Sequence, residues 1–177
     1  MAKRFPVFLD LTDREIHVSG AGRFAARRVE TLRAFSPRLT VHAPEASGRI
    51  REAASQGKLL LREEMYEPGT IPADTFMVLA ATNDAGVNER ICAECREKKI
   101  PVNVCSDREL CDFHFPGIAS KGELVIGVHA GGAAHSLAKK WTDRIRREVE
   151  EDGYDNQAEE ASDDGKAQKD GAGDADG

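Results

Sequence analysis

The sequence predicts an α/β fold, a doubly wound parallel sheet followed by a β-hairpin and a C-terminal dimerisation helix. Strand and helix patterns alternate over residues 1–112, as parallel βαβ crossovers require. The apolar run FMVLAA at residues 76–81 has the continuous hydrophobicity of a central strand that is buried on both faces. After residue 112 the pattern changes to two short strands and one long amphipathic helix.

The alternating part of the chain predicts five parallel strands and three helices. The strands are expected at Glu15 to Ser19, Arg38 to Ala43, Leu59 to Arg62, Phe76 to Ala81 and Pro101 to Val104. The helices are expected at about Arg23 to Phe35, Ala46 to Gly57 and Ala85 to Lys98. In the first helix, Ala25, Val29 and Leu32 share one face at helical spacing, so this face is expected to pack on the sheet.

The last part of the pattern combines a hairpin with a helix. Lys121-Gly122 is expected to form a tight turn between strands at Phe113 to Ser120 and Glu123 to His129. A helix is expected from about Ala134 to Asp152, with an apolar stripe at Leu137, Trp141, Ile145 and Val149. Such a stripe needs a partner. A second copy of the chain is expected to supply it, which makes a homodimer the predicted assembly.

A chain of 177 residues with 40% hydrophobic residues is long enough for one well-buried domain. We expect the sheet domain at residues 1–112, the dimerisation segment at 113–152 and a disordered acidic tail at 153–177. The tail carries eight acidic residues and two lysines, which accounts for the whole net charge of −6. Residues 1–152 therefore carry no excess of basic residues with which to bind nucleic acid. No run resembles a membrane span or a signal peptide, so the expected location is the cytoplasm.

The segment IHVSGAGRFAARRVETL fits the pattern strand, G-x-G-x-x-A, helix, which is typical of Rossmann-type dinucleotide-binding domains. Gly20 is expected to allow the tight turn, Gly22 to let the backbone approach a pyrophosphate, and Ala25 to keep the helix close to the strand. The helix N-terminus then offers its free N–H groups to the phosphates. The alternative is a glycine-rich turn in an α/β domain that binds nothing.

Two further positions fit a dinucleotide site at the carboxyl ends of the strands. Glu45 follows the second strand, where a carboxylate accepts hydrogen bonds from ribose hydroxyls and repels the 2′-phosphate of NADP. NAD is therefore the expected cofactor, although Arg27, Arg28 and Arg38 leave NADP open. Thr82 follows the central strand, at the place where a cofactor in a Rossmann-type domain contacts the protein. The alternative for Glu45 is an ordinary charge at the start of a helix, and the alternative for Thr82 is a segment that caps the next helix.

Several segments together resemble one family, the NAD-dependent precorrin-2 dehydrogenases, which include the dehydrogenase module of sirohaem synthase. These segments are FPVFLDL at residues 5–11, VSGAGRFAARRVETL at 18–32, LAATND at 79–84 with VNER after it, PVNV at 101–104 and CDFHFPGI at 111–118. The resemblance implies oxidation of precorrin-2, a tetrapyrrole, to sirohydrochlorin with NAD as hydride acceptor. Some members of the family also insert iron.

The resemblance also implies which residues form the site. The residues that match the family's pyrophosphate loop are Gly20, Ala21, Gly22, Arg23 and Phe24. Pro44 and Glu45 match its adenosine-ribose contact. The family usually has an aspartate two residues after the Asn-Val pair, where this chain has Ser106. The next residue, Asp107, is the expected catalytic group, because a carboxylate can accept the proton that is lost with the hydride, whereas a serine hydroxyl is a poor base.

Two other functions remain open. Ser106, together with a short helical part after the hairpin, favours a non-catalytic NAD- or tetrapyrrole-binding protein of the same fold. The cysteines at Cys92, Cys95, Cys105 and Cys111 suggest a redox or metal sensor. However, the C-x-x-C pair lies inside a predicted helix and the other spacing fits no common zinc pattern, so no metal site is predicted.

The roles of the histidines are also open. His17 and His42 lie within predicted strands and are expected to be structural. By contrast, His114, His129 and His135 could converge near the cleft as metal ligands or proton carriers.

Overall fold

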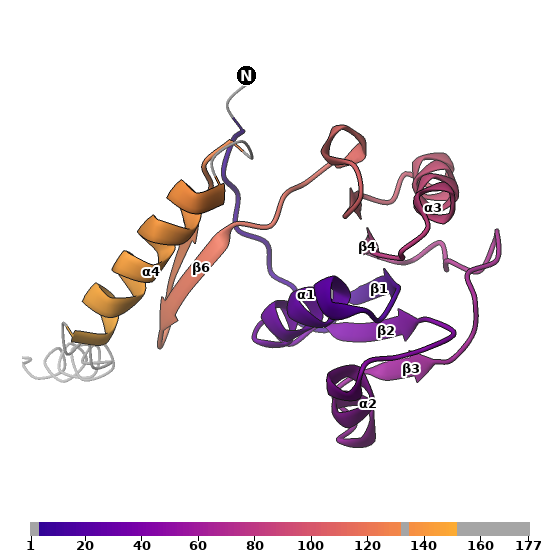
Figure 1. Ribbon diagram of the computed structural model, residues 1–177, viewed down its shortest axis with the longest axis horizontal. Helices are drawn as coiled ribbons and strands as arrows, with labels where there is room; N and C mark the ends of the chain where they lie inside the picture. Colours follow the sequence, from indigo (N-terminus) through magenta and orange to yellow (C-terminus); the bar gives the residue numbers. More distant parts are fainter. Residues whose placement is uncertain (1–3, 132–134, 152–177) are drawn as a thin grey trace, which may run out of the picture. The chain divides into compact units, whose positions relative to one another are not determined.

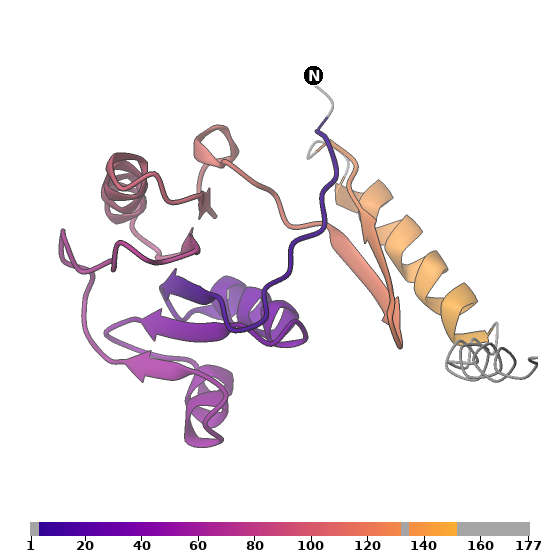
Figure 2. The same ribbon diagram turned by 180° about the vertical axis from the view of Figure 1, so that it is seen from behind.

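The computed structural model describes residues 4–131 and 135–151 (Figures 1 and 2). The chain divides into two compact units. The larger unit runs from Val7 to His114, and the smaller comprises Arg4 to Pro6 and the described residues from Phe115 onward. The predicted acidic tail at residues 153–177 lies outside the described part of the chain. Each unit has a fold of its own.

A five-stranded parallel sheet forms the centre of the larger unit. Its strands are β1 (Glu15–Ser19), β2 (Arg38–His42), β3 (Leu60–Arg62), β4 (Met77–Ala80) and β5 (Val102–Val104), in the order β3-β2-β1-β4-β5. All neighbouring strands pair in parallel. The helices are α1 (Arg23–Arg33), α2 (Gly48–Ser55) and α3 (Ala85–Glu97). The direction in which the chain crosses the sheet therefore reverses between β1 and β4.

The core lies on both faces of this sheet. All four residues of β4 are buried, as the continuous apolar run predicts. Val78 and Ala80 belong to a buried cluster with Ile91 and Cys95 of α3. The predicted stripe of α1 is also buried, at Ala25, Val29 and Leu32. Full burial of a Val or Leu side chain contributes about 1.5–3 kcal/mol, so these contacts fix the helices against the sheet.

The connections determine which face of the sheet each helix covers. α1 and α2 join β1, β2 and β3 in one direction, and α3 joins β4 to β5 in the opposite direction. Right-handed crossovers then put α1 and α2 on one face and α3 on the other. The connection from β3 to β4, residues 63–76, is fully described and contains no helix. This irregular crossing segment is therefore what faces β1, β2 and β3 on the side away from α1 and α2.

Glu94 on α3 holds the crossing segment in place. The side chain of Glu94 is buried, and its carboxylate accepts hydrogen bonds from Tyr66 Oη (2.5 Å), Gly69 N (3.0 Å) and Ile71 N (3.2 Å). Lys98 Nζ lies 2.6 Å from Glu94 Oε1 and also donates to the carbonyl of Ile71. Burial raises the pKa of Glu94 and these hydrogen bonds lower it, with a net shift below its ordinary value.

The smaller unit consists of a hairpin and a helix. β6 (Gly117–Lys121) and β7 (Leu124–Val128) pair in antiparallel fashion, and α4 (His135–Glu151) packs mainly on β6. Glycine is needed at Gly117, because a Cβ there would overlap the side chain of Thr142, which is buried. Leu137 and Trp141 of the predicted apolar stripe are 47% and 46% exposed. The hairpin therefore leaves part of that stripe uncovered.

The predicted fold class is confirmed, with a doubly wound parallel sheet followed by a hairpin and a helix. One predicted boundary is wrong, because β6 begins at Gly117 and not at Phe113. The residues before β6 bond to β5 instead: Asp112 N donates to Val102 O (2.9 Å), and Asn103 Nδ2 donates to Phe113 O (2.8 Å). A role of α4 in dimerisation stays a prediction.

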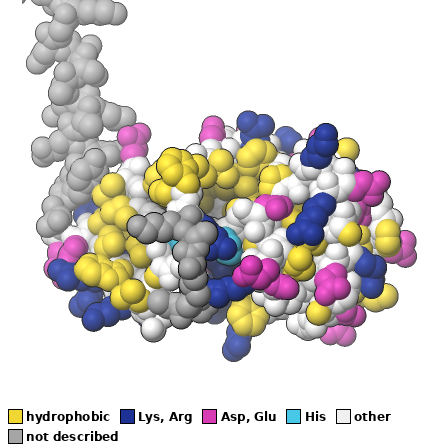
Figure 3. Space-filling view, turned by 90° about the horizontal axis from the view of Figure 1, so that it is seen from above, with side chains coloured by type: hydrophobic (Ala, Val, Ile, Leu, Met, Phe, Trp, Pro, Cys, Tyr) yellow, Lys and Arg dark blue, Asp and Glu magenta, His cyan; other side chains and the backbone are white. Residues whose placement is uncertain are grey.

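Figure 3 shows apolar side chains at the surface among charged ones. The large apolar side chains that are exposed are Phe5, Val7, Phe8, Leu9, Phe24, Leu60, Met65, Leu137 and Trp141. Among the described residues, no helix has the length and the apolar character that a membrane crossing needs.

We expect Glu94→Gln to lower the free energy of unfolding by about 1–3 kcal/mol at neutral pH, because an amide cannot accept every hydrogen bond that the carboxylate accepts. The difference should depend on pH. Since folding lowers the pKa of Glu94, its contribution is full above the ordinary value of 4.5 and is lost as the pH falls through the folded-state pKa. Urea denaturation at a series of pH values measures both effects.

The matched control for this prediction is Glu97→Gln, which removes an exposed carboxylate from the same helix. We expect this control to unfold like the wild type. A Glu94→Gln variant that is as stable as the control at neutral pH would contradict the anchoring role of Glu94.

Candidate functional site

Gly20 ends β1 in a conformation that favours glycine. Its φ is +106°, and its N–H donates to His42 O at 2.7 Å. A Cβ built on Gly20 would overlap the backbone carbonyl of Ala81, the first residue after β4. The carboxyl ends of β1, β2 and β4 therefore meet at this turn, and only a residue without a side chain permits so close an approach.

Gly22 is a glycine for a different reason. It is the N-cap of α1, with φ −74° and ψ −174°, values that any residue adopts. A Cβ built on Gly22 would meet no atom within 4 Å, so the space beside it is open. Gly22 supplies no side-chain cap, and the first turn of α1 contains no acidic residue. The N–H groups and the positive end of the helix dipole are thus suited to an anion placed in this space.

The neighbours of Gly22 fix the turn and flank the open space. Ala21 is buried, and its carbonyl accepts a hydrogen bond from Ser47 N at 3.1 Å, which ties the turn to the start of α2. Arg23 and Phe24 are exposed at the start of α1. The guanidinium of Arg23 lies over the Phe24 ring, 5.7 Å from its centroid. This places a cation at the same helix end that would receive an anion.

Pro44 and Glu45 follow β2 after Ala43, and both side chains are exposed. Because Ser19 at the end of β1 pairs with His42 at the end of β2, the two strands end at the same edge of the sheet. Glu45 therefore lies at the edge that carries the Gly20 turn. Its carboxylate is suited to accept hydrogen bonds from hydroxyl groups of a ligand at this edge.

Asn88 on α3 connects the loops that follow β4 and β5. Its side chain is fully buried, and its Oδ1 accepts from Thr82 N (3.1 Å) and Thr82 Oγ1 (2.8 Å). Its Nδ2 donates to Thr82 O (3.1 Å) and to Ser106 Oγ (3.1 Å). The polar groups of Thr82 are therefore engaged within the fold. The sequence analysis missed Asn88, although its position on the same helix face as Ile91 and Cys95 was a signal.

Asp107 lies at the carboxyl end of β5, beside Ser106. It begins the short 3-10 helix η1 (Arg108–Leu110), and its Oδ1 accepts a hydrogen bond from Glu109 N at 2.8 Å. The side chain of Asp107 is exposed. Gly20 thus lies against the backbone of Thr82, and Asn88 joins Thr82 to Ser106. Asp107 follows Ser106 at the same edge of the sheet.

The cysteines do not form a cluster with metal ligands. Cys92 and Cys95 are buried in α3, and burial raises the pKa of the Cys95 thiol to about 12. Cys105 is exposed and Cys111 is partly buried, and all four are free thiols. In the described part of the chain, no three Cys, His, Asp or Glu side chains converge as ligands of one metal ion. The geometry therefore gives no support to a sensor built on the cysteines.

The suggested convergence of three histidines stays a hypothesis. His114 belongs to the larger unit and His129 to the smaller one. The side chain of His135 lies outside the described residues.

Comparisons with known proteins relate the chain to siroheme synthases. The chain is 38% identical over 138 residues to a siroheme synthase of Nitrosospira multiformis. This alignment covers 76% of this chain and 29% of that protein. The chain is also 34% identical over 140 residues to a siroheme synthase of Methylobacillus flagellatus. This alignment covers 79% of this chain and 30% of that protein. The chain thus spans less than a third of the length of these relatives.

A solved structure and a family profile match most of the chain. The structure of "SirC, precorrin-2 dehydrogenase" is similar with a TM-score of 0.68 and 27% sequence identity, over 82% of this chain and 71% of that one. A family profile described as "Putative NAD(P)-binding" matches residues 7–117, which include the Gly20 turn and all five parallel strands. The chain therefore belongs to this NAD(P)-binding family.

Proposed function

We propose that the chain is an NAD-dependent precorrin-2 dehydrogenase, which oxidises precorrin-2 to sirohydrochlorin in sirohaem synthesis. The observation that carries the proposal is the open space beside Gly22, at the start of α1. Similarity to SirC and to siroheme synthases supports the choice of substrate and pathway. NAD, when bound, accepts a hydride from the substrate. Iron insertion is left outside the proposal.

Binding of the cofactor is the role proposed for the turn from Gly20 to Phe24. The N–H groups of the first turn of α1 donate to the pyrophosphate, and Gly22 lets the backbone approach it. The carboxylate of Glu45, next to Pro44, accepts hydrogen bonds from the adenosine ribose. Thr82 is proposed to border the cofactor at the end of β4, where its backbone lies against Gly20. The hydroxyl of Thr82 donates to Asn88 Oδ1. Thr82 is therefore proposed to contact the ligand without donating a hydrogen bond to it.

Asp107 is proposed to receive the proton. Oxidation of precorrin-2 removes two hydrogens, one as a hydride and one as a proton, so a base is required beside the substrate. Asp107 uses Oδ1 to cap η1, which leaves Oδ2 to accept the proton. Ser106 is held by Asn88 and is proposed to orient the loop that carries Asp107.

A non-catalytic NAD- or tetrapyrrole-binding protein is the second candidate. The capping role of Asp107 and the serine at position 106 favour it. The two candidates share the cofactor site and differ in turnover. Absorbance of NADH after mixing the chain with NAD and precorrin-2 separates them. Turnover supports the dehydrogenase, and NAD binding without turnover supports the second candidate.

We also propose a homodimer in the cytoplasm, without a nucleic-acid or membrane partner. Support for the dimer comes from Leu137 and Trp141 on α4, which the hairpin of the same unit leaves about half exposed. The charge balance of residues 1–152 supports the absence of a nucleic-acid partner.

Gly22→Ala should weaken NAD binding at least about tenfold, because the Cβ would occupy the space proposed for the pyrophosphate. The free energy of unfolding should stay within about 1 kcal/mol of the wild type, since that Cβ meets no atom of the fold. Gly20→Ala should instead destabilise the chain by more than about 2 kcal/mol, through its positive φ and its overlap with Ala81. Calorimetric titration with NAD and urea denaturation measure these effects. Wild-type NAD affinity in Gly22→Ala would contradict the site.

Glu45→Gln should reduce the preference for NAD over NADP by about tenfold, because an amide no longer repels the 2′-phosphate. The ratio of the two dissociation constants measures the preference. Glu52→Gln on α2 is the matched control, because it removes an exposed carboxylate beyond the first turn of that helix. A preference that stays the same in Glu45→Gln would remove Glu45 from the cofactor site.

Asp107→Asn should lower kcat about 100-fold or more, while NAD affinity and stability stay unchanged. Asparagine retains the cap of η1, so the variant removes the base and keeps the fold. Steady-state NADH formation measures kcat. Rates equal to those of the wild type would exclude Asp107 as the base.

A further inference from the structure

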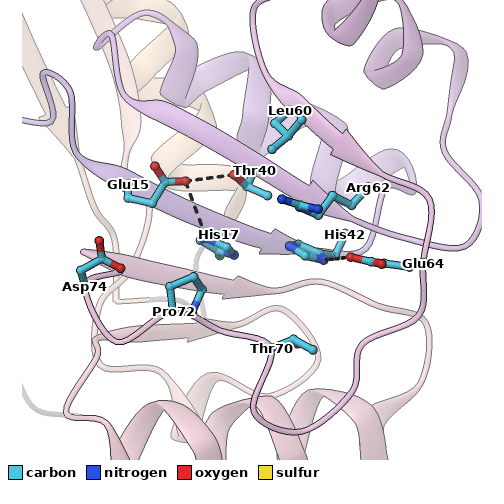
Figure 4. Close-up of a pocket in the computed structure, with 10 residues that line it drawn as sticks. All are labelled: Glu15, His17, Thr40, His42, Leu60, Arg62, Glu64, Thr70, Pro72 and Asp74. Carbon is cyan, nitrogen blue, oxygen red and sulfur yellow. Dashed lines mark hydrogen bonds and ion pairs between the residues drawn. The ribbon is translucent and has the colours of Figure 1, made fainter.

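A groove of about 510 Å³ lies on the side of β1, β2 and β3 that faces the crossing segment (Figure 4). Its floor includes His17, Thr40 and His42, whose side chains point to this face of the sheet, and residues 63–76 form the opposite wall. None of the residues from Gly20 to Phe24 lines the groove. The groove is therefore separate from the proposed cofactor site.

Two histidines lie side by side on the floor, each with a carboxylate on its far side. His17 Nε2 lies 3.6 Å from Glu15 Oε1, and His42 Nδ1 lies 3.3 Å from Glu64 Oε1. The two ring centroids are 5.4 Å apart, and the ring planes differ by 24°. Figure 4 shows Glu15, His17, His42 and Glu64 in this order across the groove.

One nitrogen of this pair is left without a partner. His42 Nε2 is buried and has no hydrogen-bond partner among the described residues. When Nδ1 of a neutral imidazole donates to a carboxylate, Nε2 presents a lone pair. Because buried polar atoms normally have partners, this nitrogen points to a ligand in the groove.

We propose that the groove binds a divalent transition-metal ion, of the class of Zn²⁺, Ni²⁺ and Co²⁺, through the imidazoles of His17 and His42. Neutral imidazole is a preferred ligand of these ions. A histidine that ligates a metal commonly donates its other ring N–H to a carboxylate, which fixes the ring and raises its basicity. Glu15 and Glu64 occupy this position for the two rings.

The charge of the groove fits a divalent cation. Its lining includes three carboxylates, Glu15, Glu64 and Asp74, and one guanidinium, Arg62, which gives a formal charge of −2 with neutral histidines. Among the described residues, no third protein side chain converges with the two imidazoles as a ligand. Water therefore completes the proposed coordination shell.

Both sides of the groove are held in place by contacts outside it. On the floor, the carboxylate of Glu15 accepts from Thr40 Oγ1 (2.9 Å) and from Arg38 Nε (3.3 Å). On the wall, Glu94 fixes the crossing segment through Tyr66 and the backbone. The site is thus built into the fold, and it does not depend on the proposed dehydrogenase activity.

Calorimetric titration of the full chain with Zn²⁺ tests the proposal. A Cys105→Ser background removes the exposed thiol as a competing ligand. We expect one Zn²⁺ per chain, and at least tenfold weaker binding in His42→Gln and in His17→Gln. Absence of stoichiometric binding in the background protein would overturn the proposal. Unchanged affinity in a folded His42→Gln variant would also overturn it.

Because His17 and His42 are largely buried, a second pair of variants keeps the test independent of folding. Glu64 is exposed at the rim, and its neighbour Glu63 pairs with Arg51 (2.7 Å) and does not line the groove. Loss of a carboxylate that orients a ligand typically weakens metal binding about 10- to 100-fold. Glu64→Gln should therefore bind Zn²⁺ more weakly by this factor, and Glu63→Gln should match the background protein. Equal affinities in the two variants would contradict the assignment.

Discussion

The backbone contact between Gly20 and Ala81 is the constraint on which the larger unit depends. It brings the end of β1 against the first residue after β4, where the direction of the chain across the sheet reverses. Parallel α/β sheets bind ligands in the crevice at this reversal. A side chain at Gly20 would separate the two strand ends. The proposed pyrophosphate loop and the proposed catalytic loop therefore share one geometric requirement.

α3 supports both proposed sites with buried polar side chains. Asn88, in its first turns, joins the loops after β4 and β5 through Thr82 and Ser106. Glu94, about two turns later, fixes the crossing segment that forms the wall of the groove. Buried polar groups stabilise a fold only when their hydrogen bonds are satisfied, and both networks meet this condition through several partners. The same helix thus positions the edge of the sheet and its uncovered face.

Local sequence patterns predicted most of the larger unit. The FMVLAA run indicated β4, the G-x-G-x-x-A pattern indicated the Gly20 turn, and helical spacing indicated the buried stripe of α1. Each of these signals is local in the sequence. The Asn88 contacts could not be predicted, since Thr82 and Ser106 lie 6 and 18 residues away and meet it only in the fold. The groove was also missed, because it requires a β3 to β4 connection without a helix. Without the groove, the positions of His17 and His42 within strands predict only a structural role.

We propose that the start of α1 receives the phosphates of a dinucleotide. A nuclear magnetic resonance titration of the ¹⁵N-labelled chain with NAD tests it most directly, because each backbone amide reports on its own surroundings. We expect the largest shift changes at the amides of Gly22, Arg23 and Phe24. Saturating NAD that leaves these three signals unchanged would contradict it.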